Sequence, residues 1–515
     1  MVRLSTGVAS ARRVPLVALL LMATACTSSL NTGQRIVAQD APAEVAGVAL
    51  EDPGQVAGPA GSSSTQAGAS SKPGVASATG AGKAPATGAA ATTGPAAGGG
   101  RAGAARVGST PAKPIEFSQG VTPTTIKIGV FLASYAGLEA EGLNLGDPVV
   151  QSQAVADYIN ARGGIAGRKV ILTYAKLEAG STNWEADEQE ICTTFTEDHK
   201  VWGVVYSLVS QGNTLLPCLA KHNTPLLSGA GGVADRKGMA EFDDYYYYTG
   251  GPDLTRMSTM YVDGLQAQGY FAGDGGIGVI RLDSAPFERA YNDALVPALA
   301  RHGLKVAEVA VVDGQTSLGK TASQMPSIVL RFQQQGIKKV MFLDNATLAV
   351  LFAIQASSQK YYPAYGLTSL SAPAGLMQPN VPPEALVGAR GVGWIPALDV
   401  DLVRDKDNPN PAAAVCRDIM VKAGQGGVSS AGVMQQRMFC DELFLLKRTL
   451  DKATALTPRG LRTQVEALGT SYNSVLTFAT KFGPGRHDGA AAYRPFGFVA
   501  DCSCFQYSGP PRGTG

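Results

Sequence analysis

Cysteine is the residue type whose number and spacing in this chain most directly indicate chemistry. Seven cysteines occur in 515 residues, and six of them fall into three close pairs. These pairs are Cys192 with Cys218, Cys416 with Cys440, and Cys502 with Cys504. Spacings of 26 and 24 residues suit disulfides between adjacent helices, each worth roughly 3–4 kcal/mol in the loop-entropy picture. A bond across the last, much shorter spacing closes a strained loop, so the sequence leaves that third pairing open.

Histidines and catalytic motifs give no sign of a metal site or an active site. The four histidines are scattered, without the spacing of metal ligands: His199, His222, His302 and His487. No nucleophile elbow, phosphate-binding loop or zinc-binding HExxH helix occurs in the sequence. The glycine-rich segment 273–278 leads into an expected strand instead of following one, so it does not make a dinucleotide-binding turn. We therefore expect no catalysis, no metal and no cofactor.

Two pairs of adjacent carboxylates remain as candidates for acid–base chemistry. They are Asp243 with Asp244, and Asp441 with Glu442. Charged pairs usually lie on solvated faces, because removing a carboxylate from water is costly. The prediction for both pairs is therefore solvent exposure without a catalytic role.

The N-terminal segment, residues 1–25, has the features of an export signal. Three arginines precede a short apolar run at 14–22, which is too short to span a bilayer, and small residues follow. The sequence ATAC at 23–26 resembles the lipobox of bacterial lipoproteins, in which Cys26 is acylated and becomes the first residue of the mature chain. Ordinary signal cleavage, which leaves Cys26 as a spare thiol, is the alternative. The odd total of seven cysteines favours lipidation, because the other six can then pair.

Residues 26–116 are interpreted as the anchor cysteine followed by a disordered linker. None of the Phe, Tyr or Trp residues precedes Phe117, and the segment consists mostly of Ala, Gly, Ser, Thr and Pro. Such a segment buries too little apolar surface to offset its conformational entropy. Its roughly 90 residues would span on the order of 50 Å, which separates the folded part from the membrane. A wall-spanning or glycosylated role for the segment is the alternative.

The overall charge excludes one class of partner. The chain has 43 Lys and Arg residues against 41 Asp and Glu residues, so its formal net charge is only +2. A protein that binds nucleic acid by bulk electrostatics carries a strong basic excess or basic blocks. We therefore expect no nucleic-acid partner.

Short β-rich runs alternate with amphipathic helical segments after Phe117. Strands are expected at 125–131, 170–174, 202–206, 225–228, 277–280, 306–312 and 339–343. Thr182 and Glu185 have the spacing of a capping box that opens a helix. Alternation of strands and helices predicts an α/β protein whose parallel sheets are covered by helices on both faces.

The number of expected strands is too large for one sheet. Four precede residue 230 and at least three follow residue 276. Between the two sets lies the aromatic run 245–248, followed by Thr-Gly-Gly-Pro. We therefore predict two doubly wound parallel-sheet lobes, with a crossing of the chain near Tyr248. Ligands of such sheets bind beyond the carboxyl ends of the strands, so the site is expected between the lobes.

The segment 157–170 has the sequence DYINARGGIAGRKV. It resembles the helix-to-strand segment of substrate-binding proteins of the leucine/isoleucine/valine-binding type, which are receptors of ABC importers. The resemblance extends more weakly to 201–207, 223–228 and 496–499. Gly163 and Gly164 can take positive φ and end a helix, so they support the fold and bind nothing.

The resemblance implies a type 1 periplasmic binding protein clamshell with a three-crossing hinge. Its lobes interleave along the chain. The first lobe takes 117–249 and 397–478, and the second takes 250–396 and 479–515. The crossings then fall near Tyr248, 393–396 and 475–480.

The resemblance also implies which residues of the first lobe hold a ligand. In family members that bind amino acids, backbone N–H groups and hydroxyls after the third and fourth strands hold the ligand carboxylate. These positions fall on Ser207, Ser210, Ser228, Gly229 and Ala230, and the glycine lets a ligand approach the backbone closely. The threonine expected at the end of the second motif is replaced by glycine.

Loops after strands of the second lobe supply the other half of the expected site, with Asn345 and Ser369 among their residues. The acidic residue that binds an ammonium group in the family is absent near Ser369. The class of solute therefore remains open among neutral polar compounds, organic acids and aromatic compounds. Tyr135, after the first strand, and Phe287 are predicted to form an aromatic wall of the site, or else to pack at its edge.

The export signal and the family resemblance together imply an exported, lipid-anchored monomer that closes around a small solute and presents it to ABC permease subunits in the membrane. The solute classes are branched-chain amino acid-like compounds, amides, and organic or aromatic acids. A ligand-sensing receptor that uses the same clamshell to signal to a separate protein is the alternative. An enzyme using the cleft is disfavoured, because no nucleophile and base can be named.

Overall fold

The structure is a computed structural model. It describes residues 116–134, 144–178, 180–206, 214–231, 234–314, 316–344, 348–377, 379–402 and 410–515. The predicted signal peptide, the anchor residue Cys26 and nearly all of the predicted linker lie outside these residues. No helix in the described part is both long and apolar enough to cross a membrane.

The first sheet has five strands, all parallel, in the order β3-β2-β4-β5-β6. Its strands are β2 (Thr125–Ser134), β3 (Lys169–Glu178), β4 (Gly203–Tyr206), β5 (Leu226–Ser228) and β6 (Tyr246–Tyr248). The aromatic run at 245–248 thus supplies the edge strand β6. A separate two-stranded sheet pairs β1 (Glu116–Phe117) with β12 (Ala455–Leu456).

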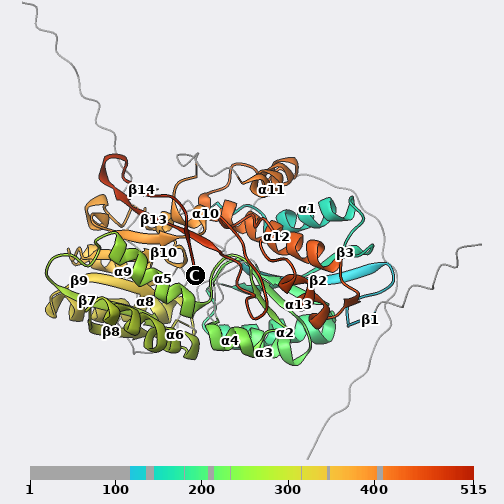
Figure 1. The fold of residues 1–515 in the computed structure, drawn as a ribbon, viewed down its shortest axis with the longest axis horizontal. Coiled ribbons are helices and arrows are strands. Elements are labelled where there is room, and N and C mark those ends of the chain that lie inside the picture. Colours follow the sequence, from blue (N-terminus) through green and yellow to red (C-terminus); the bar gives the residue numbers. More distant parts are fainter. Residues whose placement is uncertain are drawn as a thin grey trace, which may run out of the picture. The chain divides into compact units, whose positions relative to one another are not determined.

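Helices cover both faces of this first sheet (Figure 1). They are α1 (Pro148–Asn160), α2 (Trp184–Thr193), α3 (Leu215–Lys221), α4 (Arg236–Glu241), α11 (Pro411–Lys422), α12 (Ser430–Leu450) and α13 (Pro458–Glu466). Alternate residues of β2 point to opposite faces, as strand geometry requires. Ile128 and Val130 pack with α1 and α12, whereas Phe131 packs with α2 and α3.

The second sheet has eight strands, of which seven follow the order β14-β13-β11-β10-β9-β7-β8. They are β7 (Gly276–Leu282), β8 (Val306–Val312), β9 (Ile337–Leu343), β10 (Ala364–Thr368), β11 (Arg390–Gly393), β13 (Ala492–Val499) and β14 (Cys504–Tyr507), with β15 (Arg512–Gly513) beside β13. The strands β7 to β11 are parallel, whereas β13 and β14 extend the sheet in antiparallel pairs.

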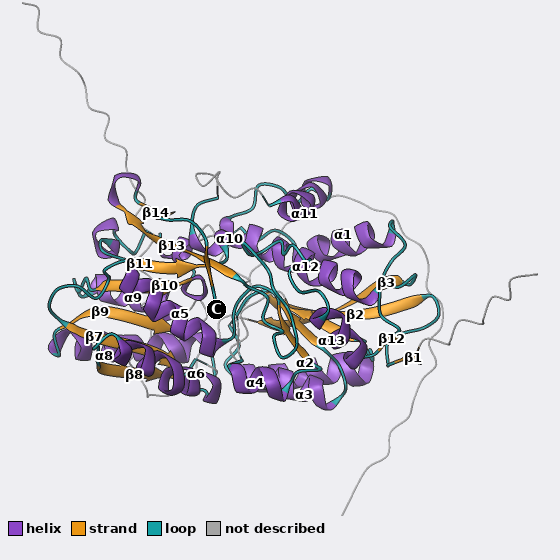
Figure 2. Ribbon diagram, viewed as in Figure 1, coloured by secondary structure: helices purple, strands orange, loops and turns teal. Residues whose placement is uncertain are grey.

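Helices lie around this second sheet (Figure 2), and their apolar side chains share one buried core with those of its strands. They are α5 (Leu254–Ala267), α6 (Ala285–Ala290), α7 (Val296–Arg301), α8 (Leu318–Gln334) and α9 (Leu348–Ser358). The short helix α10 (Pro396–Asp399) follows β11 and packs against both α12 and a 3-10 turn at Pro373–Leu376. The predicted α/β class with two parallel-sheet lobes is therefore confirmed.

The chain passes between the two sheets three times. It leaves β6 and enters α5, it leaves β11 toward α10 and α12, and it returns from α13 to β13. The first and third passages are hydrogen-bonded to each other, because Tyr248 N–H donates to the His487 carbonyl and Gly489 N–H donates to the Tyr248 carbonyl, at 3.0 and 2.7 Å. These three passages are the covalent connections between the two lobes.

One local prediction is wrong. The helix α2 is capped by Asn183, whose side chain accepts the Ala186 N–H at 3.2 Å, and not by the predicted box of Thr182 and Glu185. Asparagine and threonine are both good cap residues, and the sequence places them side by side. The hydrogen bonds of the folded chain decided between them.

Candidate functional site

Segments that follow strands of the two sheets meet each other. Trp184 N–H, after β3, donates to the Thr316 carbonyl, after β8, at 3.1 Å. Leu254 N–H, at the start of α5, donates to the Ala234 carbonyl, after β5, also at 3.1 Å. The carboxyl ends of strands from both lobes therefore face one another, which is where open α/β sheets bind ligands.

A pocket of about 360 Å³ lies where these strand ends meet. Both lobes line it, through Thr182, Asn183, Glu185, Asp283, Asp313 and Thr316. The Asp313 carboxylate is already engaged, because it accepts the Thr316 hydroxyl at 2.9 Å. Among the described residues, no three histidine, cysteine or carboxylate side chains are placed to hold a metal ion.

An ion pair joins the lobes at the base of α4. Arg289 of α6 donates through Nε and Nη2 to Asp235, at 2.6 and 2.8 Å. Asp235 also caps α4 by accepting the Gly238 N–H at 3.0 Å. Burial acts to raise the pKa of Asp235, but the hydrogen bonds and charge of Arg289 outweigh it, so the pKa lies below its ordinary value.

The predicted segment after β5 is tightly packed. Ser228 is buried, and its hydroxyl donates to the Ala230 carbonyl at 2.7 Å. Gly229 lies against Met438, and its carbonyl oxygen would lie only 1.7 Å from a Cβ added at Gly250. Only glycine fits at position 250, because the loop after β5 touches the first inter-lobe passage there.

Ser369 follows β10, as predicted, and its hydroxyl has a structural role. Its Oγ accepts the N–H groups of Trp394 and Ile395 at 2.7 and 3.1 Å. Those two residues form the second passage between the sheets. Ser369 is completely buried. Its hydroxyl therefore holds the backbone at the start of the second passage from within the protein core.

The remaining predicted site residues divide into two groups. Phe287 lies in α6, where it is 3% exposed and packs in the core of the second lobe. Tyr135, Ser207, Ser210 and Asn345 lie outside the described residues. The described residues therefore bring Ser228, Gly229 and Ala230 together, whereas Phe287 and Ser369 are placed in the other lobe.

The predicted exposure of Asp441 and Glu442 is wrong. Both side chains are 0% exposed, in the middle of α12. The pair of Asp243 and Asp244 lies nearer the surface and contacts Arg462 at 2.6 and 3.1 Å. The sequence contains a sign that Asp441 and Glu442 are buried whereas Asp243 and Asp244 are not. Asp441 and Glu442 lie within the apolar segment MFC-DE-LFLL, and apolar residues on all sides are typical of a buried helix.

Asp441 and Glu442 each bind backbone groups of the lobe junction. Asp441 accepts the Val475 N–H at 2.7 Å and the Tyr472 hydroxyl at 3.0 Å, near the third passage. Glu442 Oε2 accepts the Tyr206 N–H at 3.0 Å, and the Gly229 N–H also hydrogen-bonds to this carboxyl group. Burial raises the pKa of both carboxyl groups, and the hydrogen bonds that they accept only partly oppose it.

A third buried carboxyl group lies at the second passage. Asp399 accepts the Tyr507 hydroxyl of β14 at 2.7 Å, and it also contacts Ser369. A Cβ added at Gly393 would lie 2.2 Å from its Oδ2, so the passage and the carboxyl group are in close contact. Burial raises the pKa of Asp399 to about 7, against the lowering effect of these hydrogen bonds.

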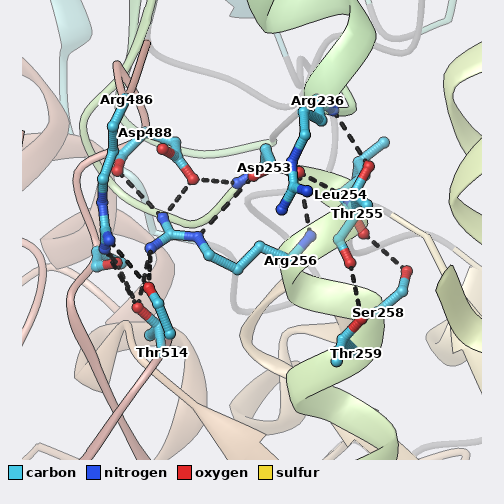
Figure 3. A network of polar contacts seen from close by, with 12 residues as sticks. Arg236, Asp253, Leu254, Thr255, Arg256, Ser258, Thr259, Arg486, Asp488 and Thr514 are labelled. Atoms are coloured by element: carbon cyan, nitrogen blue, oxygen red, sulfur yellow. Dashed lines mark hydrogen bonds and ion pairs between the residues drawn. The ribbon is translucent and has the colours of Figure 1, made fainter. Parts of the chain in front are cut away.

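A network around Arg256 joins the start of α5 to the third passage (Figure 3). The Arg256 guanidinium forms a short ion pair with Asp488, whose carboxylate also accepts the Asp253 N–H at 2.7 Å. Arg256 and Arg486 both donate to the Thr514 hydroxyl, at 3.0 and 3.4 Å. Segments far apart in the sequence are thereby held together beside the passages.

The six cysteines of the described part form three disulfides, in the predicted pairs. Cys192–Cys218 joins α2 to α3, and Cys416–Cys440 joins α11 to α12. Cys502–Cys504, the pair that the sequence left open, is also bonded, in the turn between β13 and β14. None of the three disulfides joins the two sheets, so they stabilise each lobe separately.

Comparison with known proteins gives the same fold. The family model described as periplasmic binding protein matches residues 125–497. A fatty acid ABC transporter substrate-binding protein from Thermomonospora curvata superposes with a TM-score of 0.55 at 15% identity, over 78% of this chain and 95% of that one. An ABC transporter substrate-binding protein from Aeropyrum pernix gives 0.56 at 13% identity, over 76% and 96%.

A structure described as a possible leucine/isoleucine/valine-binding protein from Rhodopirellula baltica SH 1 gives a TM-score of 0.53 at 15% identity, over 77% of this chain and 98% of that one. No curated protein matches the chain in sequence. These identities are low, so the superpositions establish the fold alone. The family match covers most of the chain, and the protein therefore belongs to the periplasmic binding protein family.

Proposed function

We propose that the protein is an extracytoplasmic solute-binding protein that delivers a small molecule to an ABC importer. The observation that carries the proposal is the meeting of strand ends from two lobes, through Trp184 with Thr316 and Asp235 with Arg289. A solute held there contacts both lobes only when they are closed, so its binding energy favours the closed form. The expected solutes are branched-chain amino acid-like compounds, amides, and organic or aromatic acids.

The proposed moving bodies are the interleaved lobes 117–249 with 397–478, and 250–396 with 479–515. Two hydrogen bonds support this division of the chain. Asp441 accepts the Val475 N–H and so attaches the third passage to the first lobe, and Ser369 accepts the Trp394 N–H and so attaches the second passage to the second lobe. Each passage is thereby fixed to one lobe, and the other lobe can rotate relative to it. The proposed site includes the loop from Ser228 to Ala230, together with Tyr135, Ser207, Ser210, Phe287, Asn345 and Ser369.

Membrane attachment through a lipid on Cys26 completes the proposal. A lipidated cysteine and a long linker keep the receptor next to its permease, which raises the effective concentration of each for the other. Export also places the chain in a compartment where disulfides persist, in agreement with its three bonded pairs.

The test is a thermal-shift screen of the whole chain against amino acids, amides, organic acids and aromatic acids. A solute that binds the folded state raises the melting temperature by mass action, by an amount that grows with its concentration. Cells that lack the protein should then lose uptake of the same radiolabelled solute. Binding without any loss of uptake would favour the sensing receptor, and chemical conversion of the solute by pure protein would contradict both functions.

A further inference from the structure

The disulfide Cys502–Cys504 closes a much shorter loop than the other two disulfides. Only Ser503 separates its cysteines, whereas the cysteines of the other two bonds are 26 and 24 positions apart. Ser503 adopts a left-handed conformation, with φ 48°, which costs free energy in a residue that has a side chain. Such a residue persists only where its surroundings impose the conformation, and outliers of this kind cluster at functional sites.

The two sulfur atoms of this disulfide differ in their access to solvent. Cys502 is half-buried at the end of a 3-10 turn, whereas Cys504 is 2% exposed at the start of β14. Both cysteines of the bond between α11 and α12 are buried. Thiol–disulfide exchange begins when a thiolate reaches one sulfur of the bond. An incoming thiolate can therefore attack Cys502, and Cys504 is then the leaving group.

Gln506 supplies a hydrogen-bond donor to the leaving sulfur. Its Nε2 lies 3.4 Å from Cys504 Sγ and 3.4 Å from Cys502 Sγ. The leaving group departs as a thiolate, and a charged acceptor is bound more strongly by the same donor than a neutral one. The Gln506 amide therefore stabilises the thiolate as the bond between the sulfurs breaks, and a better-stabilised thiolate leaves faster.

The bond between α2 and α3 has the opposite arrangement. Its partly exposed sulfur belongs to Cys218, so attack there would expel Cys192, which is 0% exposed in an apolar core. A thiolate formed in that core is poorly solvated. The Gln189 amide lies 3.6 Å from Cys218 Sγ, on the sulfur that would be attacked and not on the one that would leave. The described part of the chain thus favours exchange at Cys502 over exchange at Cys218.

The hairpin around Cys502 has further contacts that hold it without the disulfide. The strand β14 lies at the edge of the second sheet and pairs with β13 at four positions (Figure 1). Phe505 is 1% exposed in the core, and the Tyr507 hydroxyl donates to Asp399 at 2.7 Å. The two thiols of the reduced form therefore stay close together, so the bond can form again.

We propose that Cys502–Cys504 is a site of reversible thiol–disulfide exchange, whose substrate is a dithiol. A thiolate of the dithiol attacks Cys502 Sγ, the bond between the two sulfurs breaks, and Cys504 leaves as a thiolate that takes up a proton. The second thiol of the substrate then attacks the mixed disulfide and expels Cys502, which is protonated in turn. The protein gains two electrons and two protons, and the dithiol is oxidised to a disulfide. This activity is separate from solute binding.

The test titrates the whole chain with dithiothreitol at graded ratios of its reduced to its oxidised form. Free thiols are then blocked with N-ethylmaleimide, and peptide mass spectrometry reports each cysteine separately. Cys502–Cys504 should be half-reduced at a ratio at least about 10-fold lower than either other disulfide, and it should form again in excess oxidised dithiothreitol. Reduction of either other disulfide at the same or a lower ratio would overturn the proposal.

Two single-cysteine variants test which sulfur is attacked. Cys504→Ala leaves the half-buried Cys502 thiol, and Cys502→Ala leaves the buried Cys504 thiol. N-ethylmaleimide should label Cys502 at least about 10-fold faster than Cys504, with labelling followed at the peptide that carries each thiol. Equal rates in the two folded variants would contradict attack at Cys502. If either variant does not fold, the order of reduction in the wild type still decides.

A matched pair of glutamine variants tests the donor. Gln506→Leu removes the amide beside the leaving sulfur, so the initial rate at which dithiothreitol reduces Cys502–Cys504 should fall about threefold or more. Gln189→Leu, which removes the amide beside Cys218 Sγ, should leave that rate unchanged. Equal rates in Gln506→Leu and the wild type would overturn the role of Gln506.

Discussion

Asp235 in the first lobe and Arg289 in the second are joined by two parallel hydrogen bonds, at 2.6 and 2.8 Å, although 54 residues separate them in the sequence. The Asp235 side chain is 3% exposed and that of Arg289 is 31% exposed, so the pair is partly shielded from water. A bidentate arginine–carboxylate pair is more specific in geometry than a single ion pair. This pair therefore favours the arrangement in which the lobes touch.

Replacing Arg289 by Met should weaken solute binding without unfolding the protein. Asp235 keeps its role as the cap of α4, but the closed form loses about 0.5–1 kcal/mol, so affinity falls about two- to fivefold. Small-angle X-ray scattering without solute should show a larger radius of gyration. Arg331→Met is a matched control, because Arg331 pairs with Glu308 within one lobe at 2.9 Å. Equal effects of both variants on affinity would contradict the role of the pair between the lobes.

The pair of Asp235 and Arg289 also predicts that the contact between the lobes depends on pH. Because Arg289 lowers the pKa of Asp235 in the folded protein, the stabilisation is complete above the unfolded-state pKa and is lost as the pH falls through the folded-state value. The difference in scattering between the wild type and Arg289→Met should therefore shrink as the pH falls below the ordinary aspartate pKa of about 3.9, and disappear once Asp235 is protonated. A difference that persists there, with both proteins still folded, would count against an electrostatic origin.

Asp399→Asn should become relatively more stable as the pH rises. Burial raises the pKa of Asp399 to about 7, so the wild type loses stability between about pH 4 and pH 7, where only the unfolded carboxyl group ionises readily. Asparagine cannot ionise and still accepts the Tyr507 hydroxyl. Urea unfolding at pH 4.5 and 7.5 should show the variant gaining roughly 3 kcal/mol relative to the wild type. A constant difference between the two proteins would refute the raised pKa.

Ser369→Ala should destabilise the fold more than it changes binding. The variant leaves the N–H groups of Trp394 and Ile395 without their acceptor, at a cost of roughly 2–4 kcal/mol for two buried donors. Urea unfolding measures this loss, and Ser323→Ala, on the exposed side of α8, is the control. A 10-fold loss of solute affinity with an unchanged unfolding midpoint would show that the hydroxyl serves the solute instead.

Removing single disulfides should have unequal effects. The chain-entropy model assigns roughly 3–4 kcal/mol to the loop closed by Cys416–Cys440 and roughly 2 kcal/mol or less to the short loop of Cys502–Cys504. Denaturant unfolding of the two double alanine variants, with the other disulfides oxidised, measures both. A larger loss from the Cys502 and Cys504 variant would mean that the turn between β13 and β14 matters beyond chain entropy.

Cys26→Ser should release the protein from the membrane. Serine cannot take a thioether-linked lipid, so the chain should move from the membrane to the soluble fraction, and labelling with radioactive palmitate should be lost. Cys502→Ser, which leaves Cys26 intact, is the control. Unchanged membrane association of the Cys26 variant would contradict lipid anchoring there.

The fold was largely predictable because its signals are local. Seven expected strands correspond to β2, β3, β4, β5, β7, β8 and β9. The bounds of β10 and β11 were not predicted, because both strands contain glycines, although the loop with Ser369 was expected to follow a strand. Gly366 and Gly391 lie where Tyr261 and Phe496 pack against the sheet, so their place in a strand depends on side chains from distant segments.

The candidate site was less predictable, because burial of a polar group depends on what lies opposite it. Asp441 and Glu442 are both charged residue types that usually lie at the surface, yet both are buried. Only the apolar residues beside them in the sequence indicate that their helix is buried. Ser369 was placed after the correct strand, but its two N–H partners lie 25 and 26 residues away. Hydroxyls and carboxylates serve structure and binding equally well, so their role is set by their partners.

The sequence by itself determined the two-lobed α/β fold, the pairing of Cys192 with Cys218 and of Cys416 with Cys440, and the positions of the loops that follow the strands. These features follow from periodicity and spacing within short stretches. Only the tertiary structure decided that Arg289 meets Asp235, that Arg256 meets Asp488 across 232 residues, and that Glu442 lies under two strand ends. The physical reason is that the energy of a charged group depends on its burial and its partners, which packing of distant segments supplies.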